Sequence, residues 1–411
     1  MKLFKSSLLA LAVAATSTWA NAESLAITNA TVHTANEQGV LTNATILVED
    51  GVITAINPSA ANADKVIDAQ GKNLTPGIIS VMNNLGLVEV GAVSRSRDAG
   101  DKGASITFDP SLAYNPKSTV IAYTRKGGIT SSVVSPRGGD SLFKGQTFYT
   151  DLSGEFDSIR VANNAVYVEL GAESKGSRAT NLQKLTDKLA DFQAKLEKAK
   201  KDDKKGDELK RDEQVLKSLL DGEKLMVVYA DRASELLNII KLKQTFGLNL
   251  AIVSAADAVV VADELAKADV PVIIDAMQNL PSSFDALNNS LDNAAKLINA
   301  GVKVVITTGG DTHNMYQLRY NAGNAIANGL TPEQALAAIT STVAEVFGLD
   351  AGEIAVGKKA DLVLWSADPF ELSTKVEHIW IDGKEYSTQS RSDKLRDRYM
   401  ATSDMPRAYT K

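Results

Sequence analysis

Residues 225–275 read LMVVYADRASELLNIIKLKQTFGLNLAIVSAADAVVVADELAKADVPVIID. Three apolar runs that are typical of buried strands alternate here with two amphipathic segments that are typical of helices. These segments are 225–229, 233–245, 250–254, 258–267 and 270–275. Strands that alternate with helices predict parallel β/α units, because a helical crossover returns the chain to the same end of the sheet. This stretch therefore predicts an α/β fold with a parallel sheet.

The same alternation extends from about Pro76 to Leu349. The other strand candidates are 77–81, 129–135, 166–170 and 302–307, and the other helix candidates are 284–300, 317–328 and 332–347. About seven or eight such units predict a (β/α)8 TIM barrel over residues 76–350. A doubly wound sheet is the alternative, but its glycine-rich turn after the first strand is missing from the sequence.

The two flanks of this region have a different pattern, with short β-type runs. Residues 23–75 contain the Asp50-Gly51 step, which is a strong hairpin signal, and residues 351–386 contain the runs 360–365 and 376–384. Both flanks are therefore predicted to be rich in strands. The segment 387–411 is polar and forms a C-terminal tail.

The first 22 residues are typical of a secretory signal peptide. Lys2 and Lys5 precede the apolar run 7–15, and residues 20–22 (Ala-Asn-Ala) supply the small side chains that a signal peptidase reads. The run is too short to span a bilayer comfortably, although a retained membrane anchor is the alternative. We therefore expect cleavage after Ala22, a periplasmic or secreted bacterial protein, and no membrane anchoring.

Composition excludes several function classes. The 411 residues include no cysteine and three histidines, so disulfides, thiolate metal sites, cysteine nucleophiles and four-histidine metal centres cannot be built. The formal net charge of −6 argues against nucleic acid or an anionic membrane as a partner, because both select basic surfaces. No G-x-S-x-G elbow occurs, so a serine hydrolase of that type is unsupported.

A charged segment at about 180–222 interrupts the alternation. Its first part carries an apolar stripe at helical spacing, and a run with nearly balanced charges follows. The stripe consists of Leu182, Leu185, Leu189, Phe192 and Leu196. One interpretation is a solvated helical hairpin inserted into the barrel region. The alternative is that the stripe forms the surface for a partner or a dimer.

Three further segments match a known family pattern. Residues 74–86 read LTPGIISVMNNLG, residues 352–365 read GEIAVGKKADLVLW, and residues 376–383 read VEHIWIDG. The first is similar to P-G-hydrophobic-I-D-x-H-x-H-L-G, at the first barrel strand of the amidohydrolase superfamily, and the others are similar to its tail. The chain most resembles the secreted, imidazolonepropionase-like branch. This resemblance implies a TIM barrel with a small β-sandwich domain built from residues 23–75 and 351–386.

Members of that family usually hold one or two divalent metals, typically zinc, through histidines at the strand ends. The resemblance places these ligand positions at Met82 and Asn84 on the first strand, Tyr167 on the fourth, Tyr229 on the fifth and Ser254 on the sixth. None of the five residues is a histidine. The resemblance therefore implies a degenerate metal site, and we expect no bound cofactor.

The family's catalytic aspartate on the last strand corresponds to Asp311, in a register fixed to within one or two residues. His313 is a second catalytic candidate, because it is the one histidine in the predicted barrel, with a solvated loop histidine as the alternative. Arg137, Lys144 and Arg232 are candidates for binding a substrate, for example through a carboxylate. Structural roles in a βα loop or at a helix start are the alternatives for these three residues.

These observations leave three functions open. The resemblance implies a hydrolase that acts on carbon–nitrogen bonds of amides, cyclic amides or small peptides. The missing histidines favour a catalytically inactive member, which serves as a binding or partner subunit of an active paralogue or assembles as a homo-oligomer. A solute-binding protein is the third alternative. An oxygen-ligand site for Ca²⁺ or Mg²⁺ could also form from Asn84, Asp231, Asp257 and Asp311.

Overall fold

The computed structural model describes residues 24–171, 175–201, 208–309 and 311–400. The predicted signal peptide and residues 401–411 of the predicted tail lie outside these ranges. Within them, no helix has both the length and the apolar character that a membrane crossing requires.

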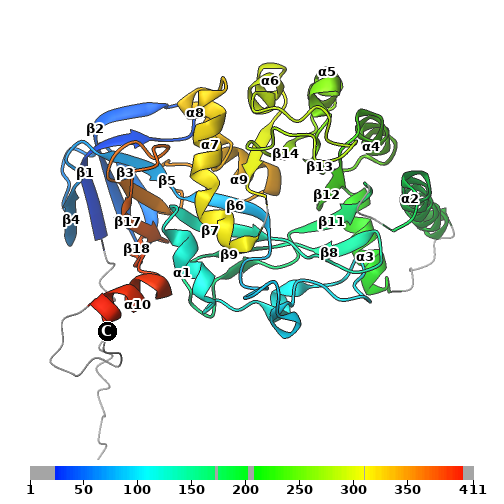
Figure 1. The fold of residues 1–411 in the computed structure, drawn as a ribbon, viewed down its shortest axis with the longest axis horizontal. Coiled ribbons are helices and arrows are strands. Elements are labelled where there is room, and N and C mark those ends of the chain that lie inside the picture. The colour runs from blue at the N-terminus through cyan, green and yellow to red at the C-terminus, as the bar shows by residue number, and fades with distance from the viewer. Residues whose placement is uncertain (1–23, 172–174, 202–207, 310, 401–411) are drawn as a thin grey trace, which may run out of the picture.

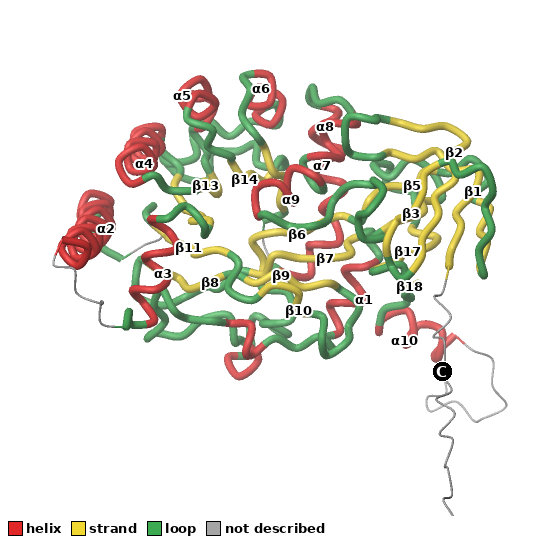
Figure 2. The backbone as a smooth tube through the Cα atoms, turned by 180° about the vertical axis from the view of Figure 1, so that it is seen from behind, coloured by secondary structure: helices red, strands yellow, loops and turns green. Residues whose placement is uncertain are grey.

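One mixed sheet combines the strands of both chain flanks at one end of the molecule (Figures 1 and 2). Its order is β18-β17-β16-β5-β1-β2-β3, and β4 also pairs with β1. The strands are β1 (Ser24–His33), β2 (Val40–Glu49), β3 (Val52–Ile56), β4 (Lys65–Asp68), β5 (Asn73–Pro76), β16 (Leu362–Trp365), β17 (Val376–Ile381) and β18 (Lys384–Glu385). The two flanks meet where β5 pairs antiparallel with β16, with Leu74 opposite Leu364.

Local sequence explains this sheet well. In β2, Ala44, Ile46 and Val48 are buried and alternate with less buried residues, which is the two-residue period of a strand with one covered face. The predicted hairpin at Asp50-Gly51 is confirmed, because β2 and β3 pair antiparallel across it. Both turn residues have positive φ, 50° and 78°, as a tight two-residue hairpin requires.

The central part of the chain contains two more sheets. One has the order β10-β9-β7-β6, and the other has the order β15-β14-β13-β12-β11-β8. Their strands are β6 (Ile78–Asn83), β7 (Ile129–Val134), β8 (Phe143–Gln146), β9 (Phe148–Asp151), β10 (Ile159–Val161), β11 (Ala165–Glu169), β12 (Leu225–Ala230), β13 (Leu250–Ser254), β14 (Val272–Asp275) and β15 (Val304–Thr307). The strands from β11 to β15 pair in parallel, which confirms the predicted α/β fold.

The helices lie between these strands in the chain, and α2, α4, α5 and α6 line the outer side of the six-stranded sheet (Figure 1). The α-helices are α1 (Thr119–Arg125), α2 (Arg178–Lys201), α3 (Arg211–Leu220), α4 (Ala233–Phe246), α5 (Ala262–Lys267), α6 (Asn293–Asn299), α7 (Leu318–Ala327), α8 (Pro332–Ala337), α9 (Ser341–Phe347) and α10 (Arg391–Met400). Short 3₁₀ helices span η1 (Ser94–Ser96), η2 (Pro110–Ala113), η3 (Ala258–Val261) and η4 (Thr312–Gln317). The predicted helix at 284–300 begins only at Asn293, and the one at 258–267 divides into η3 and α5.

The structure agrees only in part with the predicted closed parallel barrel. Residues 143–151 run antiparallel to their neighbours, and only Thr147 separates β8, which pairs with β11, from β9, which pairs with β7. This segment therefore joins the two central sheets (Figure 2). No hydrogen-bonded ladder joins β15 to β6 within the described residues, so the sheets are not closed there.

The segment between α8 and α9 occupies the position between β15 and β6. The Ile306 N–H donates to the Ala338 carbonyl, and the Ile79 N–H donates to the Ile339 carbonyl, each at 2.9 Å. Because these carbonyls bond to the two strands, the helix predicted at 332–347 breaks there into α8 and α9. The inserted segment thus satisfies strand edges that would otherwise be buried without partners.

The leucine stripe of α2 packs into the main core rather than forming a free surface. Leu185 and Leu189 are 0% exposed, and Phe192 is 5% exposed. Leu182 and Leu196 pack partly buried against the same core. The alternative that this stripe forms a partner or dimer surface is therefore wrong, because the protein's own core already covers it.

Trp365 connects the mixed sheet to the central sheets. Its side chain is fully buried, and its indole Nε1 donates to Thr75 Oγ1 at 2.9 Å. Gly128 has a φ of 78° directly against the indole ring, so a side chain at this position would overlap the ring. This contact needs glycine both for its backbone conformation and for its lack of a Cβ.

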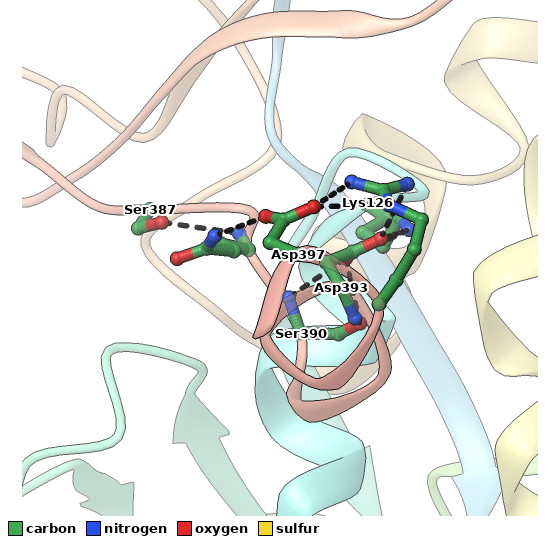
Figure 3. Close-up of polar contacts among 7 residues, drawn as sticks. Lys126, Ser387, Ser390, Asp393 and Asp397 are labelled. Atoms are coloured by element: carbon green, nitrogen blue, oxygen red, sulfur yellow. Dashed lines mark hydrogen bonds and ion pairs between the residues drawn. The ribbon is translucent and has the colours of Figure 1, made fainter. Parts of the chain in front are cut away.

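Helix α10 docks on α1 through polar contacts (Figure 3). Lys126 Nζ lies 3.0 Å from the Asp393 carboxylate, and Ser390 Oγ donates to the same carboxylate at 2.6 Å. These contacts, with the Ser390 hydroxyl as the largest cause, lower the pKa of Asp393 to about 2. No side chain of α10 is buried, so polar contacts rather than core packing hold this helix.

Candidate functional site

A cavity of about 820 Å³ lies at the carboxyl ends of the central strands. Its wall includes the ends of β6, β11, β12, β13, β14 and β15 and the start of the loop after β7, so both central sheets contribute. In α/β folds built from parallel strands, ligands bind at these carboxyl ends, because the βα loops gather there. The cavity is therefore the candidate functional site.

The five positions that the family pattern assigns to metal ligands all lie in the wall of this cavity. They are Met82, Asn84, Tyr167, Tyr229 and Ser254. Asn84 is already engaged, because its Nδ2 donates to the Ser135 carbonyl at 2.8 Å and its Oδ1 accepts from Arg137 Nε at 2.6 Å. The structure thus brings the predicted positions together, with methionine, amide, phenol and hydroxyl groups in place of histidines.

This donor set does not fit the family's metal. Zinc sites use histidine nitrogens, thiolates and carboxylates, and the three histidines all lie outside the cavity wall. Within the described residues, no three histidine or acidic side chains gather closely enough to hold a metal ion. The oxygen-ligand alternative is not assembled either, because Asp311 is exposed and Asp257 binds the Ala233 N–H at 3.1 Å.

The three predicted substrate-binding residues have different positions. Arg137 lines the cavity, near the start of the loop that follows β7. Lys144 is buried and forms an ion pair with Glu169 at 2.7 Å. Arg232 is bonded through Nε to the Asp285 carboxylate and does not line the cavity. Only Arg137 therefore has access to a ligand in this cavity.

The two predicted catalytic residues do not reach the cavity wall. Asp311 and His313 are both exposed, at the start of η4, although their neighbour Thr312 lines the cavity. The aspartates that line the wall are Asp231, after β12, and Asp275, at the end of β14. Asp275 was not singled out by the sequence, although its place as the polar end of an apolar strand is the signal that could have identified it.

Asp275 holds the ends of two strands together. Its carboxylate accepts hydrogen bonds from the Gly309 N–H at 2.9 Å, from Asn321 Nδ2 at 2.9 Å and from the Met277 N–H at 3.0 Å. These donors occupy both carboxylate oxygens. Asp275 therefore fixes the loops after β14 and β15 rather than offering a free carboxylate to a ligand.

Thr308 provides an unpartnered polar group in the cavity wall. Its side chain is only 8% exposed, and its Oγ1 has no hydrogen-bond partner among the described residues. A buried hydroxyl without a partner costs about 1–3 kcal/mol. The oxygen itself has almost no accessible surface, so a ligand can bind it only when the side chains that cover it move.

Three non-glycine residues of this wall have a left-handed backbone conformation. Met82, Ser254 and Ala255 have positive φ values of 55°, 76° and 49°. Non-glycine residues in this region cost about 1–3 kcal/mol each and cluster at functional sites, where the fold imposes the conformation. Two of these three residues occupy positions that the family pattern assigns to metal ligands.

The loop between β14 and α6, residues 276–292, forms one side of the cavity. Asp285 in this loop is 8% exposed and is held by Arg232 and by Arg178 of α2. Arg178 also pairs with Glu235 of α4 at 2.8 Å. This ion-pair network explains why residues 284–292 do not extend α6, because Asp285 is fixed against α2 and α4.

The sequence was compared with protein families and with curated proteins. The sequence model described as the amidohydrolase family matches residues 179–386. Amidohydrolase tasK of Hapsidospora irregularis is 21% identical over an alignment of 387 residues, and the match covers 82% of this chain and 39% of that protein. An imidazolonepropionase of Geobacillus sp. (strain WCH70) is 39% identical over an alignment of 92 residues, and the match covers 21% of this chain and 22% of that protein. The chain thus spans about two fifths or less of these curated relatives.

A solved structure extends the comparison to the whole fold. An amidohydrolase from Thermotoga maritima MSB8 is 24% identical, with a TM-score of 0.80, and the match covers 88% of this chain and 99% of that chain. At this identity, the likeness shows the fold. The match to the family model is the stronger evidence, because residues 179–386 are just over half of the 411-residue chain. This chain belongs to the amidohydrolase family.

Proposed function

We propose that this chain binds a small polar ligand in the cavity at the strand ends, without hydrolysing it by the metal-dependent route of its family. The observation that carries the proposal is a cavity of about 820 Å³ at the strand ends. Its family ligand positions are occupied by Met82, Asn84, Tyr167, Tyr229 and Ser254. A cavity of this size with polar groups in its wall favours binding of a small polar molecule. The same side chains do not favour metal-activated water, which needs histidine and carboxylate ligands.

The first test combines metal analysis with a thermal-shift screen on the mature protein, purified without chelators or a histidine tag. We expect less than about 0.1 metal ion per chain, before and after incubation with Zn²⁺, Mn²⁺ and Ca²⁺. Compounds that bind should raise the melting temperature without being consumed, since a ligand at 100 times its Kd adds about 2.7 kcal/mol. Near-stoichiometric metal together with turnover would overturn the proposal.

Thr308→Val is the matched variant for this test. It removes the hydroxyl at nearly constant volume, so the unliganded protein should not lose stability, and ligand-induced stabilisation should fall. Thr42→Val, an exposed position on β2, serves as the control and should leave ligand binding unchanged. A loss of unliganded stability in Thr308→Val, with full ligand binding, would assign the hydroxyl a purely structural role.

A hydrolase that acts on carbon–nitrogen bonds is the second candidate function. Family membership favours it, and the two curated relatives are named as an amidohydrolase and an imidazolonepropionase. Asp231 is buried and lines the cavity, so it is the residue that would accept a proton from water in such a reaction. Turnover of a simple amide, cyclic amide or dipeptide that is abolished by Asp231→Asn would establish this function.

We further propose that the two central sheets act as one distorted (β/α)8 barrel around the cavity. The support is that segment 143–151 bonds to both sheets and that segment 338–339 bonds to β6 and β15. An experimental structure in which the β8 and β9 segments separate the two sheets would contradict this arrangement.

Export and assembly are the remaining parts of the proposal. Lys2, Lys5 and the apolar run 7–15 support secretion with cleavage after Ala22, and N-terminal sequencing of the protein from a periplasmic extract tests it. An inactive member could serve an active paralogue as a partner subunit or form a homo-oligomer. Light scattering of the purified protein and co-purification with a paralogue from the same cells would distinguish these states.

A further inference from the structure

We infer that the ligand of this cavity is a zwitterion, a free amino acid or short peptide whose ammonium group binds Asp231 and whose carboxylate binds Arg137. This inference rests on the proposed function, because it names the class of ligand for the same cavity. It is supported by which charged side chains of the cavity wall have a partner of opposite charge within the protein and which do not.

Asp231 is a buried carboxylate with little compensation. Its side chain lies in the cavity wall, and the residue is 8% exposed. One hydrogen bond reaches its carboxylate from within the described chain, from the Ala256 N–H to Oδ1 at 3.3 Å. The adjacent Arg232 does not neutralise it, because Arg232 Nε is bonded to Asp285. A buried carboxylate without a cation is costly, so the site favours a positively charged ligand group.

The other acidic groups of the wall differ from Asp231 in this respect. Glu169 is paired with Lys144 at 2.7 Å, and Asp275 accepts three hydrogen bonds at 2.9–3.0 Å. Their charges are therefore compensated by the protein itself. Asp231 is the acidic residue of this wall whose negative charge has no cation within the described chain, so a ligand would supply one.

Arg137 supplies the opposite charge at another part of the wall. Its Nε donates to Asn84 Oδ1 at 2.6 Å, and its backbone N–H donates to the Ala99 carbonyl at 2.7 Å, so both the loop and the guanidinium are oriented. Among the described residues, no acceptor binds its two terminal nitrogens. A guanidinium with two parallel free N–H donors suits a carboxylate.

The two charges come from different sheets. Arg137 follows β7 of the four-stranded sheet, and Asp231 follows β12 of the six-stranded sheet. A ligand that contacts both therefore carries one positive and one negative group. The volume of about 820 Å³ is within the range of about 300–1,000 Å³ that is usual for small-molecule sites, so it admits an amino acid or short peptide.

The experiment measures binding to the full mature protein by isothermal titration and thermal shift. The probes are ω-amino acids of increasing length from glycine to 8-aminooctanoate and the dipeptides Ala-Ala and Leu-Gly. Each is compared with its N-acetylated form and with its carboxamide. We expect at least one zwitterionic probe to bind, and blocking of either end to weaken it by about tenfold or more.

Two variants assign the two ends. Asp231→Asn should remove the preference for a free ammonium group, and Arg137→Gln should remove the preference for a free carboxylate. Asp231→Asn keeps an oxygen for the Ala256 N–H, so its melting temperature without ligand should not fall. Asp157→Asn and Arg95→Gln are controls at exposed positions outside the cavity wall, and they should bind the probes as the wild type does.

The outcomes separate this inference from the proposed function. Equal binding of blocked and free probes, or binding of uncharged compounds alone, would overturn the zwitterion assignment and leave ligand binding intact. An Asp231→Asn variant that is destabilised but retains its preference for the ammonium group would assign Asp231 a structural role and also overturn it. Stoichiometric metal with turnover would instead overturn the proposed function.

Discussion

Asp361 belongs to the GKKADLV segment and is predicted here to make the folding free energy depend on pH. Its carboxylate accepts a hydrogen bond from the Asp382 N–H at 2.8 Å, under the turn between β17 and β18. The pKa of Asp361 is raised to about 7, mainly by burial and to a smaller extent by the neighbouring Asp382 charge. The hydrogen bond from the Asp382 N–H and the charge of Lys359 act in the opposite direction. The folded protein therefore holds this proton near neutral pH.

The sign and size of the effect follow from this pKa. The carboxyl loses its proton near pH 3.8 in the unfolded chain and near pH 7 in the folded protein. Between these values the folded state binds more protons, so the free energy of unfolding falls as the pH rises from about 4 to 7 and is constant above. A difference of about three pH units corresponds to about 4 kcal/mol.

Asp361→Asn carries no titrating group and keeps an oxygen to accept the Asp382 N–H. We expect its free energy of unfolding, relative to the wild type, to increase by about 4 kcal/mol between pH 4 and pH 8. Urea unfolding at several pH values measures this difference, and the other titrating groups cancel in it. Asp157→Asn, at an exposed position, is the control and should show no such trend. A difference for Asp361→Asn that stays constant within about 1 kcal/mol would refute the reasoning.

Four other predictions follow. Gly128→Ala should lower the free energy of unfolding by about 3 kcal/mol or more, through positive φ and overlap with the indole, whereas Gly39→Ala, in open space at φ 65°, should cost about 1 kcal/mol in the same melts. The lowered pKa of Asp393 stabilises docked α10 above about pH 4 and loses this effect toward pH 2, so proteolytic release of the tail should accelerate there. Leu189→Ala should lower the free energy of unfolding by about 2–5 kcal/mol and leave the molecular mass by light scattering unchanged. An altered mass at normal stability would instead show that the α2 stripe contacts another chain. Asp285→Asn weakens the ion pairs with Arg178 and Arg232 and should speed amide hydrogen exchange in the loop 276–292. Unchanged exchange there would show that these ion pairs do not hold the loop.

Several elements could be predicted from the sequence because local chemistry decides them. The apolar runs at 225–229 and 250–254 became β12 and β13, and the segment 233–245 became α4. Thr331 caps α8 by accepting the Gln334 N–H at 3.2 Å, as its place before Pro332 predicts. In each case, the pattern of apolar side chains or a turn residue acts over a few neighbouring positions.

The sequence also determined which groups are missing from the candidate site. Three histidines and no cysteine exclude the family's histidine ligand set in any conformation, and this conclusion does not depend on where Met82 or Tyr229 lies. The sequence did not determine which polar residues line the cavity. Asp311 appeared catalytic because of its place after the last strand, but it is exposed, whereas Thr308 and Asp231 line the cavity.

Only the tertiary structure decided the features that depend on distant partners. Residues 143–151 run antiparallel because two different strands, β7 and β11, accept them as neighbours, and nothing in the segment itself specifies that direction. The break between α8 and α9 exists because Ala338 and Ile339 bond to strands more than 30 residues away in the chain. The charge of Asp231 is likewise left without a cation because Arg232 pairs with Asp285 instead. Hydrogen bonds and ion pairs across the fold have no local sequence signal, since each depends on which groups the packing of the whole chain brings within reach.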